Sequence, residues 1–216
     1  DGVDEDDNVE QRKWGTLPGF SAFAPKPHEV LAEDLDIVDF ERGVKLAGAR
    51  FEVLKGQGAR LRRALLSLML DMQVDEHGYI EMLPPFVANA DTMTANGNLP
   101  KFADQLFKLE GLPYYLIPTA EIPLTNYHRD EILEESVLPL YFTSGTPCCG
   151  SEAGAASRDT RGLIRRHQFE KVEMVKIVKP ETSMDELEKM VGNAEAILQR
   201  LELPYRVVLL SSGDTG

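Results

Sequence analysis

The sequence has few cysteines, no positive net charge and no long apolar segment, and each absence excludes a class of protein. Cys148 and Cys149 are the only two cysteines among 216 residues. Neighbouring cysteines rarely form an unstrained disulfide, so a disulfide scaffold and a cysteine zinc site are excluded and a reducing cytoplasm is expected. The formal net charge of −13 provides no field that attracts nucleic acid to the whole surface. No segment approaches the roughly 20 apolar residues of a membrane helix, and no signal peptide opens the chain.

Short catalytic patterns are missing as well. The chain contains neither Gly-x-Gly-x-x-Gly nor the Walker Gly-Lys-Ser/Thr sequence, which excludes nucleotide binding through either of those loops. The four histidines, His28, His77, His128 and His167, lack metal-ligand spacing such as His-Glu-x-x-His, so no metal site is expected. We expect His28 and His77 to lie on the surface and His167 to orient the hairpin described below.

The hydrophobic pattern favours one large α+β domain. The hydrophobic content of 43% is enough for a single core. Strands are predicted at 114–117, 138–143, 169–178 and 205–210, and helices from about Ala59 to about Asp75 and over 124–133. A capping box at Ser183–Glu186 predicts the start of a further helix. Strands joined by short loops, with few helical crossovers, predict a mostly antiparallel sheet flanked by helices.

The first 13 residues differ from the rest of the chain. The segment DGVDEDDNVEQRK is rich in acids and almost without apolar groups, which predicts a solvated acidic linker. Residues 14–216 are then expected to form the folded domain. Because the chain starts abruptly and stops directly after a predicted strand, we expect it to be part of a longer protein.

The densest group of reactive side chains lies between Thr146 and Glu173. A loop rich in Gly, Ala and Ser joins two predicted strands and is followed by four arginines within nine residues, Arg158, Arg161, Arg165 and Arg166. Guanidinium groups bind phosphate oxygens in pairs, and glycines let backbone amides approach the same oxygens. Phe169, where the chain re-enters the strand, is placed to stack on a purine ring. A basic loop that pairs with the acids of this acidic protein accounts for the spacing equally well.

Glu173 is a candidate for recognising a small polar ligand. Strand alternation puts it on the same face as Phe169 and Lys171. A carboxylate in a covered pocket recognises an amine or a hydroxyl, because leaving either unpaired costs about 1–3 kcal/mol. The alternative is a surface salt bridge with Lys171 or Lys176, worth about 0–1 kcal/mol.

The segment Thr119-Ala120-Glu121 is a second candidate. It offers a hydroxyl and a carboxylate two residues apart, and the prolines on either side stiffen its backbone. Such a pair suits a small ligand with an ammonium group. A turn with solvated polar side chains is the simpler interpretation of these three residues taken alone.

Together these segments resemble class II aminoacyl-tRNA synthetases, and bacterial-type seryl-tRNA synthetases in particular. Residues 58–87, with a long helix, a strand and Pro84-Pro85, are similar to motif 1, the dimer-forming element. LIPTAEIPLTNYHRDEIL is similar to the serine-binding loop of the family, and RDTRGLIRRHQFEKVEMVKI to the second half of motif 2, which spans about residues 146–176. WGTLPGF, LPKFADQLFKLEG and LPYRVVLLSSGDTG fit the same family, so the resemblance covers nearly all of residues 8–216.

The resemblance implies a reaction and a set of roles. The family activates serine with ATP, accompanied by Mg²⁺, to seryl-adenylate and pyrophosphate and then transfers serine to tRNA(Ser), as a cytoplasmic homodimer. In such a reaction a carboxylate attacks the α-phosphorus in line, so the catalyst mainly positions reactants and neutralises charge. By resemblance, serine is bound by Thr119, Ala120, Glu121 and Glu173; ATP is bound by Gly150, Ser151, Glu152, Arg165 and Phe169; and Glu152 and Arg165 are catalytic.

The chain departs from the family pattern at one position and at both ends. Motif 2 of the family begins Phe-Arg-Ser-Glu, whereas this chain has Cys149-Gly150-Ser151-Glu152. The missing arginine contacts the α-phosphate, and loss of one such fixed donor costs roughly 2.7–4 kcal/mol of transition-state stabilisation. Motif 3 and the N-terminal coiled coil that binds tRNA are absent from the sequence. We therefore expect a partial synthetase catalytic domain with impaired activity.

Two other functions stay open. A non-catalytic synthetase paralogue that binds a partner or dimerises would tolerate Gly150. A ligase that loads an amino acid onto a carrier protein would need no tRNA-binding arm. The Thr119-Ala120-Glu121 segment, Arg165, Phe169 and Glu173 favour the tRNA-charging enzyme.

Overall fold

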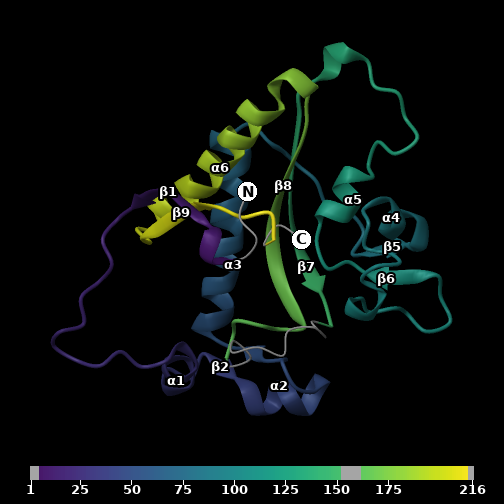
Figure 1. Ribbon diagram of the computed structural model, residues 1–216. Helices are drawn as coiled ribbons and strands as arrows, with labels where there is room; N and C mark the ends of the chain where they lie inside the picture. Colours follow the sequence, from purple (N-terminus) through teal and green to yellow (C-terminus); the bar gives the residue numbers. More distant parts are fainter. Residues whose placement is uncertain (1–4, 152–161, 214–216) are drawn as a thin grey trace. The chain divides into compact units, whose positions relative to one another are not determined.

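The computed structural model describes residues 5–151 and 162–213, and its elements are labelled in Figure 1. The chain divides into two compact units, Asp1–Pro25 with Leu187–Gly216, and Lys26–Glu186. We refer to them as the terminal unit and the central unit. Among the described residues, no helix has both the length and the apolar character required to cross a bilayer.

Helices and strands alternate along the chain. The helices are α1 (His28–Asp34), α2 (Phe40–Ala47), α3 (Gln57–Asp71), α4 (Ala90–Ala95), α5 (Glu121–Thr125) and α6 (Ser183–Arg200), with a π-helical turn at Met72–Glu76 and 3-10 turns at Glu5–Asp7, Ala103–Gln105, Glu135–Val137 and Pro180–Thr182. The strands are β1 (Val9–Trp14), β2 (Val38–Asp39), β3 (Val53–Leu54), β4 (Ile80–Glu81), β5 (Val87–Asn89), β6 (Tyr114–Leu116), β7 (Leu140–Cys149), β8 (Gln168–Ile177) and β9 (Tyr205–Leu209). The pairs β1–β9, β2–β3, β5–β6 and β7–β8 are antiparallel and β4–β7 is parallel. The predicted α+β class with mostly antiparallel pairing is confirmed.

The antiparallel pair β7–β8 is the centre of the central unit. It is paired along its whole length, from Leu140 opposite Ile177 to Cys149 opposite Gln168. The sequence predicted a first strand ending at residue 143, which is wrong by six residues, because β7 continues through Pro147 to Cys149. Proline has no N–H to donate to a second neighbouring strand. Pro147 is tolerated in β7 because the second neighbour, β4, pairs with β7 only at Phe142 and Thr143.

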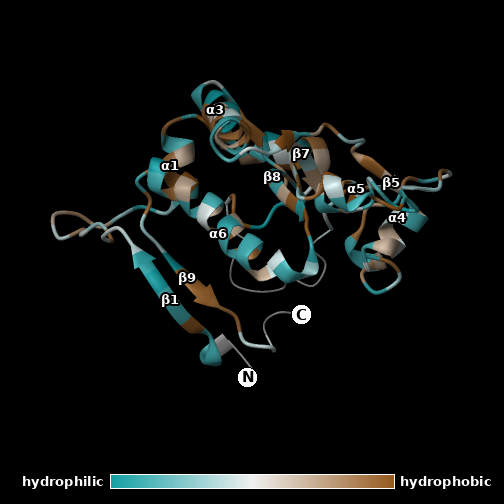
Figure 2. Cartoon of the chain, turned by 90° about the horizontal axis from the view of Figure 1, so that it is seen from above, coloured by the Kyte–Doolittle hydropathy of each residue, from teal (hydrophilic) through white to brown (hydrophobic). Residues whose placement is uncertain are grey.

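Helix α3 covers one face of this pair, as Figures 1 and 2 show from two directions. Gly145 of β7 permits the close approach, since a Cβ at this position would lie 2.8 Å from Cδ1 of Leu70. From the same helix, Arg62 Nη2 lies 2.5 Å from Oε1 of Glu170 on β8. The helix predicted from about residue 59 to 75 is confirmed as α3 with the π-helical turn that follows it.

The other face of β7–β8 is covered by apolar side chains around α5. Ala120 and Leu124 are almost fully buried against Phe142 of β7 and Val175 of β8. A second apolar cluster lies under α4, β5 and β6 and contains Ala88, Met93, Leu106, Ile117 and Ile122. The loop that carries Thr119-Ala120-Glu121 therefore lies between two cores, which hold its backbone in place.

The helix predicted over residues 124–133 is wrong. The structure has the short helix α5, which begins at Glu121 and ends at Thr125. Thr125 Oγ1 donates to the carbonyl oxygen of Glu121 at 2.8 Å, and Asn126 Nδ2 donates to that of Ile122 at 3.0 Å. Side chains that hydrogen-bond to nearby carbonyls compete with helix continuation, and Asp130 then has a positive φ of 64°.

The terminal unit contains the paired strands β1 and β9. The sequence predicted an acidic linker for residues 1–13, and residues 9–13 instead belong to β1. All side chains of β1 are exposed, so the strand has no apolar alternation to reveal it, and Figure 2 shows β1 as hydrophilic and β9 as hydrophobic. Trp14 of β1 stacks on Tyr205 of β9 with ring centroids 5.9 Å apart, and Arg12 Nε of β1 donates to both oxygens of Glu195 on α6 at 3.0 and 3.1 Å.

A buried ion pair fixes the first turn of α6 to β8 within the central unit. Lys176 Nζ lies 2.9 Å from Oε2 of Glu186, and the two side chains are only 4% and 8% exposed. The same carboxylate oxygen accepts a hydrogen bond from Tyr141 at 2.6 Å, and Lys176 Nζ lies 4.2 Å from the centre of the Tyr141 ring. Burial, with smaller contributions from Tyr141 and Glu186, raises the pKa of nearby Tyr79 to about 12.

Replacing Lys176 tests the energetic weight of this pair. Lys176→Met leaves the buried Glu186 carboxylate without its cation, so we expect the free energy of unfolding at neutral pH to fall by about 3–5 kcal/mol. Lys179→Met is the matched control, because Lys179 and Glu135 form an exposed ion pair and such pairs contribute about 0–1 kcal/mol. Denaturant unfolding measures both variants. Equal losses in the two variants would contradict this account.

Candidate functional site

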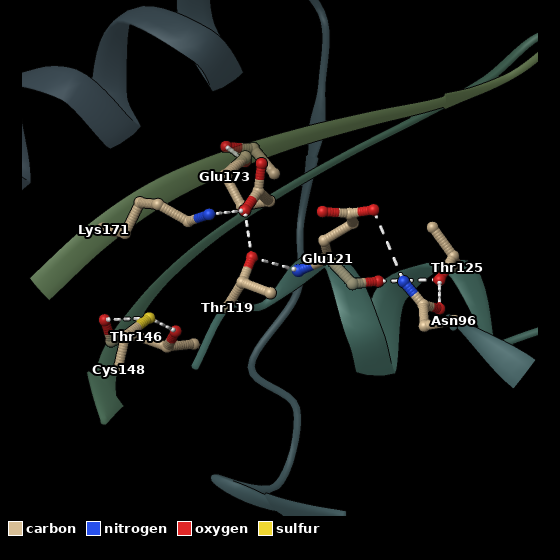
Figure 3. Close-up of polar contacts among 9 residues, drawn as sticks. Asn96, Thr119, Glu121, Thr125, Thr146, Cys148, Lys171 and Glu173 are labelled. Carbon is tan, nitrogen blue, oxygen red and sulfur yellow. Dashed lines mark hydrogen bonds and ion pairs between the residues drawn. The ribbon is translucent and has the colours of Figure 1, made fainter. Parts of the chain in front are cut away.

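Thr119 and Glu173, both predicted to bind serine, are in direct contact. Thr119 Oγ1 donates to Glu173 Oε2 at 2.6 Å and accepts from the backbone N–H of Glu121 at 3.1 Å (Figure 3). The first residue lies between β6 and α5 and the second on β8, so the contact joins segments 54 residues apart. The structure therefore brings the predicted loop and the predicted strand residue into one cluster.

Lys171 completes this cluster. Its Nζ lies 2.6 Å from the same Oε2 of Glu173, so the salt bridge considered as the alternative for Glu173 is also present. The lysine side chain is 38% exposed and that of Glu173 18%, so the pair is partly screened by water and contributes little net free energy. Within residues 5–151 and 162–213, no hydrogen bond reaches Oε1 of Glu173, which leaves this oxygen for a ligand.

Glu121 lies at the edge of the cluster and is directed toward Asn96. Asn96 Nδ2 lies 3.4 Å from Glu121 Oε1, and Asn96 Oδ1 accepts from Thr125 Oγ1 at 2.5 Å (Figure 3). Asn96 Oδ1 also accepts from Asn126 Nδ2 at 2.9 Å. The sequence pattern did not indicate Asn96 as a site residue. Its signal was the Asn-Gly pair directly after a short helix, which typically marks a turn but says nothing about its neighbours in space.

The buried residues beneath the cluster are apolar or neutral. Ala120 and Cys148 are fully buried, and Cys148 Sγ lies 3.4 Å from Oγ1 of Thr146. Burial raises the pKa of the Cys148 thiol, and the hydrogen bond from Thr146 lowers it by less. Cys148 is therefore held as a thiol, which is a weak nucleophile. This agrees with a reaction that needs no covalent enzyme intermediate.

Gly150 and Ser151 lie at the base of the hairpin. The N–H of Gly150 donates to the carbonyl of His167 at 2.9 Å, and His167 Nδ1 lies 3.0 Å from the Gly150 carbonyl oxygen. Ser151 Oγ donates to the carbonyl of Asp104 at 2.7 Å. His167 thus bridges the two sides of the hairpin, which supports the orienting role predicted for it.

Arg165 and Phe169 line a cavity of about 240 Å³, together with Leu163, Ile164, Arg166 and Glu170. Thr119 and Glu173 do not line this cavity, so it brings together two of the predicted ATP residues but neither of these two predicted serine residues. Phe169 lies opposite Cys148 in the strand register and on the same face as Lys171 and Glu173. Glu152, Arg158 and Arg161 lie outside the described residues.

A family profile supports a synthetase fold. The profile described as "tRNA synthetase class II core domain (G, H, P, S and T)" matches residues 107–216. This range is half of the chain and contains every residue predicted for the site.

Individual relatives agree with the profile. The serine–tRNA ligase of Desulforamulus reducens is 63% identical over 215 residues, covering 100% of this chain and 50% of that protein. The crystal structure of seryl-tRNA synthetase from Pyrococcus horikoshii complexed with ATP matches with a TM-score of 0.94 and 37% identity, covering 100% of this chain and 52% of the other. The cytoplasmic serine–tRNA ligase of Naegleria fowleri in complex with AMP matches with a TM-score of 0.91 and 31% identity, over 98% and 50% of the two chains.

The chain spans about half the length of the curated relatives it matches. The resemblance to seryl-tRNA synthetases drawn from the sequence motifs is confirmed by these matches. The chain therefore belongs to the class II tRNA synthetase core family, and within that family it is similar to serine–tRNA ligases.

Proposed function

We propose that this chain is part of the catalytic domain of a serine–tRNA ligase, and that its Thr119–Glu173 cluster binds serine. The hydrogen bond of 2.6 Å between these two side chains carries the proposal, because it joins the two predicted serine-binding segments at one point. The similar synthetase from Pyrococcus horikoshii was crystallised in complex with ATP, which supports ATP as the second substrate.

The serine half of the site follows from the charges at the cluster. An ammonium group donates to the carboxylate of Glu173 and to the hydroxyl oxygen of Thr119, and takes the place of the Lys171 ammonium at Oε2. The exchange requires little free energy, because the pair with Lys171 is partly screened by water. The serine hydroxyl then needs a polar partner nearby, and Glu121 supplies an exposed carboxylate at the edge of the cluster.

The ATP half uses the cavity that Arg165 and Phe169 line. Phe169 offers a ring face for adenine, and Arg165 offers a cation for a terminal phosphate, at the wall of the same 240 Å³ cavity. The serine carboxylate attacks the α-phosphorus; the new bond joins carboxylate oxygen and phosphorus, and the bond to the bridging oxygen breaks as pyrophosphate leaves. The chain contributes position and positive charge to this step.

Mg²⁺, transfer to tRNA(Ser) and a cytoplasmic location belong to this proposal as parts carried over from the family. In the described part of the chain, no three His, Cys, Asp or Glu side chains are grouped to hold a metal ion, so these residues do not supply a magnesium site by themselves. The free thiols of Cys148 and Cys149 suit a reducing compartment.

A homodimer is also part of the proposal, through helix α3 of motif 1. Leu61 of α3 is 57% exposed and Leu35 67%, and both line an open groove of about 630 Å³ beside the helix. Exposed apolar surface of this kind marks interaction sites, and identical chains most often associate as symmetric pairs.

Removing either polar partner of the cluster tests the serine site. We expect Thr119→Val and Glu173→Gln each to weaken binding of a non-hydrolysable seryl-adenylate by about tenfold to a hundredfold, because each leaves a polar group of the ligand unpaired. Isothermal calorimetry measures the affinity, and Thr182→Val is the control, since Thr182 is exposed on a separate 3-10 turn. Unchanged affinity in both site variants would place the serine site elsewhere. If the unaltered chain does not bind the analogue, the non-catalytic binding module becomes the better account.

Restoring the family arginine tests the effect of Gly150. We expect Gly150→Arg to raise serine-dependent ATP–pyrophosphate exchange by about a hundredfold to a thousandfold, since one fixed donor to the α-phosphate contributes that much. Gly192→Arg is the matched control, because a side chain at Gly192 meets nothing within 4 Å. If the unaltered chain, Gly192→Arg and Gly150→Arg all catalyse the exchange at the same rate, the glycine at position 150 costs no activity.

The dimer is tested by sedimentation at micromolar concentration. We expect the unaltered chain to sediment as a dimer and Leu61→Glu to shift it to a monomer, because a charge in an apolar contact is costly. Ile132→Glu is the control, since Ile132 is fully exposed and lies outside the α3 groove. A monomer for the unaltered chain would exclude the proposed interface.

A further inference from the structure

His28 contacts the segment that follows the arginine-bearing loop, 135 residues farther along the chain. The backbone N–H of Leu163 donates to Nε2 of His28 at 2.8 Å. His28 is the first residue of α1, directly after Pro27, so its backbone is held at the start of a helix. The surface position predicted for His28 is correct, but the side chain has a partner that the sequence pattern did not indicate.

The chemistry of this hydrogen bond defines the state of the imidazole. A ring nitrogen that accepts a hydrogen bond carries no proton, so the proton of the neutral ring is on Nδ1. Nδ1 of His28 lies 3.3 Å from Oε2 of the neighbouring Glu29, and a carboxylate at this position favours that tautomer. The histidine therefore acts as an oriented acceptor for the Leu163 amide.

Gly162 makes the contact possible on the other side. Its φ is +62°, and a Cβ at this position would lie 2.2 Å from Nε2 of His28 and 3.1 Å from Cβ of Glu29. Both the backbone conformation and the close approach require glycine. The imidazole ring of His28 and the backbone of Gly162 are thus in close contact.

Two further contacts hold the same segment at its other end. Arg166 Nη1 pairs with the carboxylate of Glu52, whose side chain is 9% exposed. The N–H of His167 donates to the carbonyl of Arg50 at 3.2 Å. Arg165 lies between these contacts and the His28 contact, so its backbone is held from both sides while its side chain is exposed.

We propose that His28 is a positioning residue for the ATP half of the site, which holds Gly162 and Leu163 so that Arg165 and Phe169 form the wall of their shared cavity. This inference rests on the proposed function, because the cavity is assigned to ATP there. His28 itself does not line the cavity and touches no substrate in this assignment. By restricting the conformations of the cavity wall before ATP binds, His28 lowers the conformational entropy that is lost on binding.

The first test needs no ligand. Amide hydrogen exchange of the chain, followed by NMR, should show exchange at Leu163 about tenfold faster in His28→Phe, which keeps a ring but has no acceptor. His28→Gln should retain slow exchange, because its side-chain oxygen accepts near the position of Nε2. His28→Ala replaces the phenylalanine variant if the larger ring disturbs folding. Unchanged exchange at Leu163 in both variants without an acceptor would overturn the proposal.

The second test separates this inference from the proposed function. Calorimetry should show ATP binding weakened about three- to tenfold in His28→Phe, restored in His28→Gln, and unchanged in His77→Phe, a histidine of the central unit outside this segment. Serine binding should be the same in all four proteins. Equal ATP affinity in His28→Phe and the unaltered chain would overturn the positioning role and leave the proposed function intact. If the unaltered chain does not bind ATP, the ATP assignment fails, and exchange at Leu163 alone decides whether His28 holds the segment.

Discussion

The continuous antiparallel pairing of β7 and β8 is the constraint on which the central unit depends. Ten consecutive residue pairs set one register, and in such a register a shift of one residue would move every side chain to the opposite face. Glu173 therefore faces the loop with Thr119, while Glu170 faces Arg62 of α3. The two faces of the β7–β8 pair differ: one packs against α3 at Gly145, and the other supports the candidate site.

Nearly all polar side chains that lie buried along β7 and β8 have a hydrogen-bond or ion-pair partner. Lys176 and Glu186 lie almost without solvent exposure, and Tyr141 supplies the hydrogen bond that an isolated pair would lack. Desolvating two charges is costly unless geometry and hydrogen bonds compensate, so such a group favours one arrangement of β7, β8 and the start of α6. By contrast, Lys171 and Glu173 remain partly exposed, which leaves their pairing free to change when a ligand binds.

The two halves of the candidate site are held by different means. The proposed serine half is fixed by the sheet and by two apolar clusters, which bury Ala120, Ile122 and Leu124 around the loop. The proposed ATP half is carried largely by the segment that precedes β8, which is held by individual contacts from His28, Glu52 and Arg50. Loops carry function when a rigid scaffold positions them, and here the scaffold reaches the loop through a few side chains and one backbone carbonyl.

The sequence by itself determined the family, the α+β class, the strands at β6, β8 and β9, and the departure at Gly150, because these depend on local motifs and on hydrophobic periodicity. It also indicated Thr119 and Glu173 as site residues. Only the tertiary structure decided that these two side chains touch, that Asn96 lies beside Glu121, that His28 holds Leu163, and that residues 9–14 pair with β9. Each of these contacts joins residues far apart in the chain. Their formation depends on packing and register, which no local pattern of residues encodes.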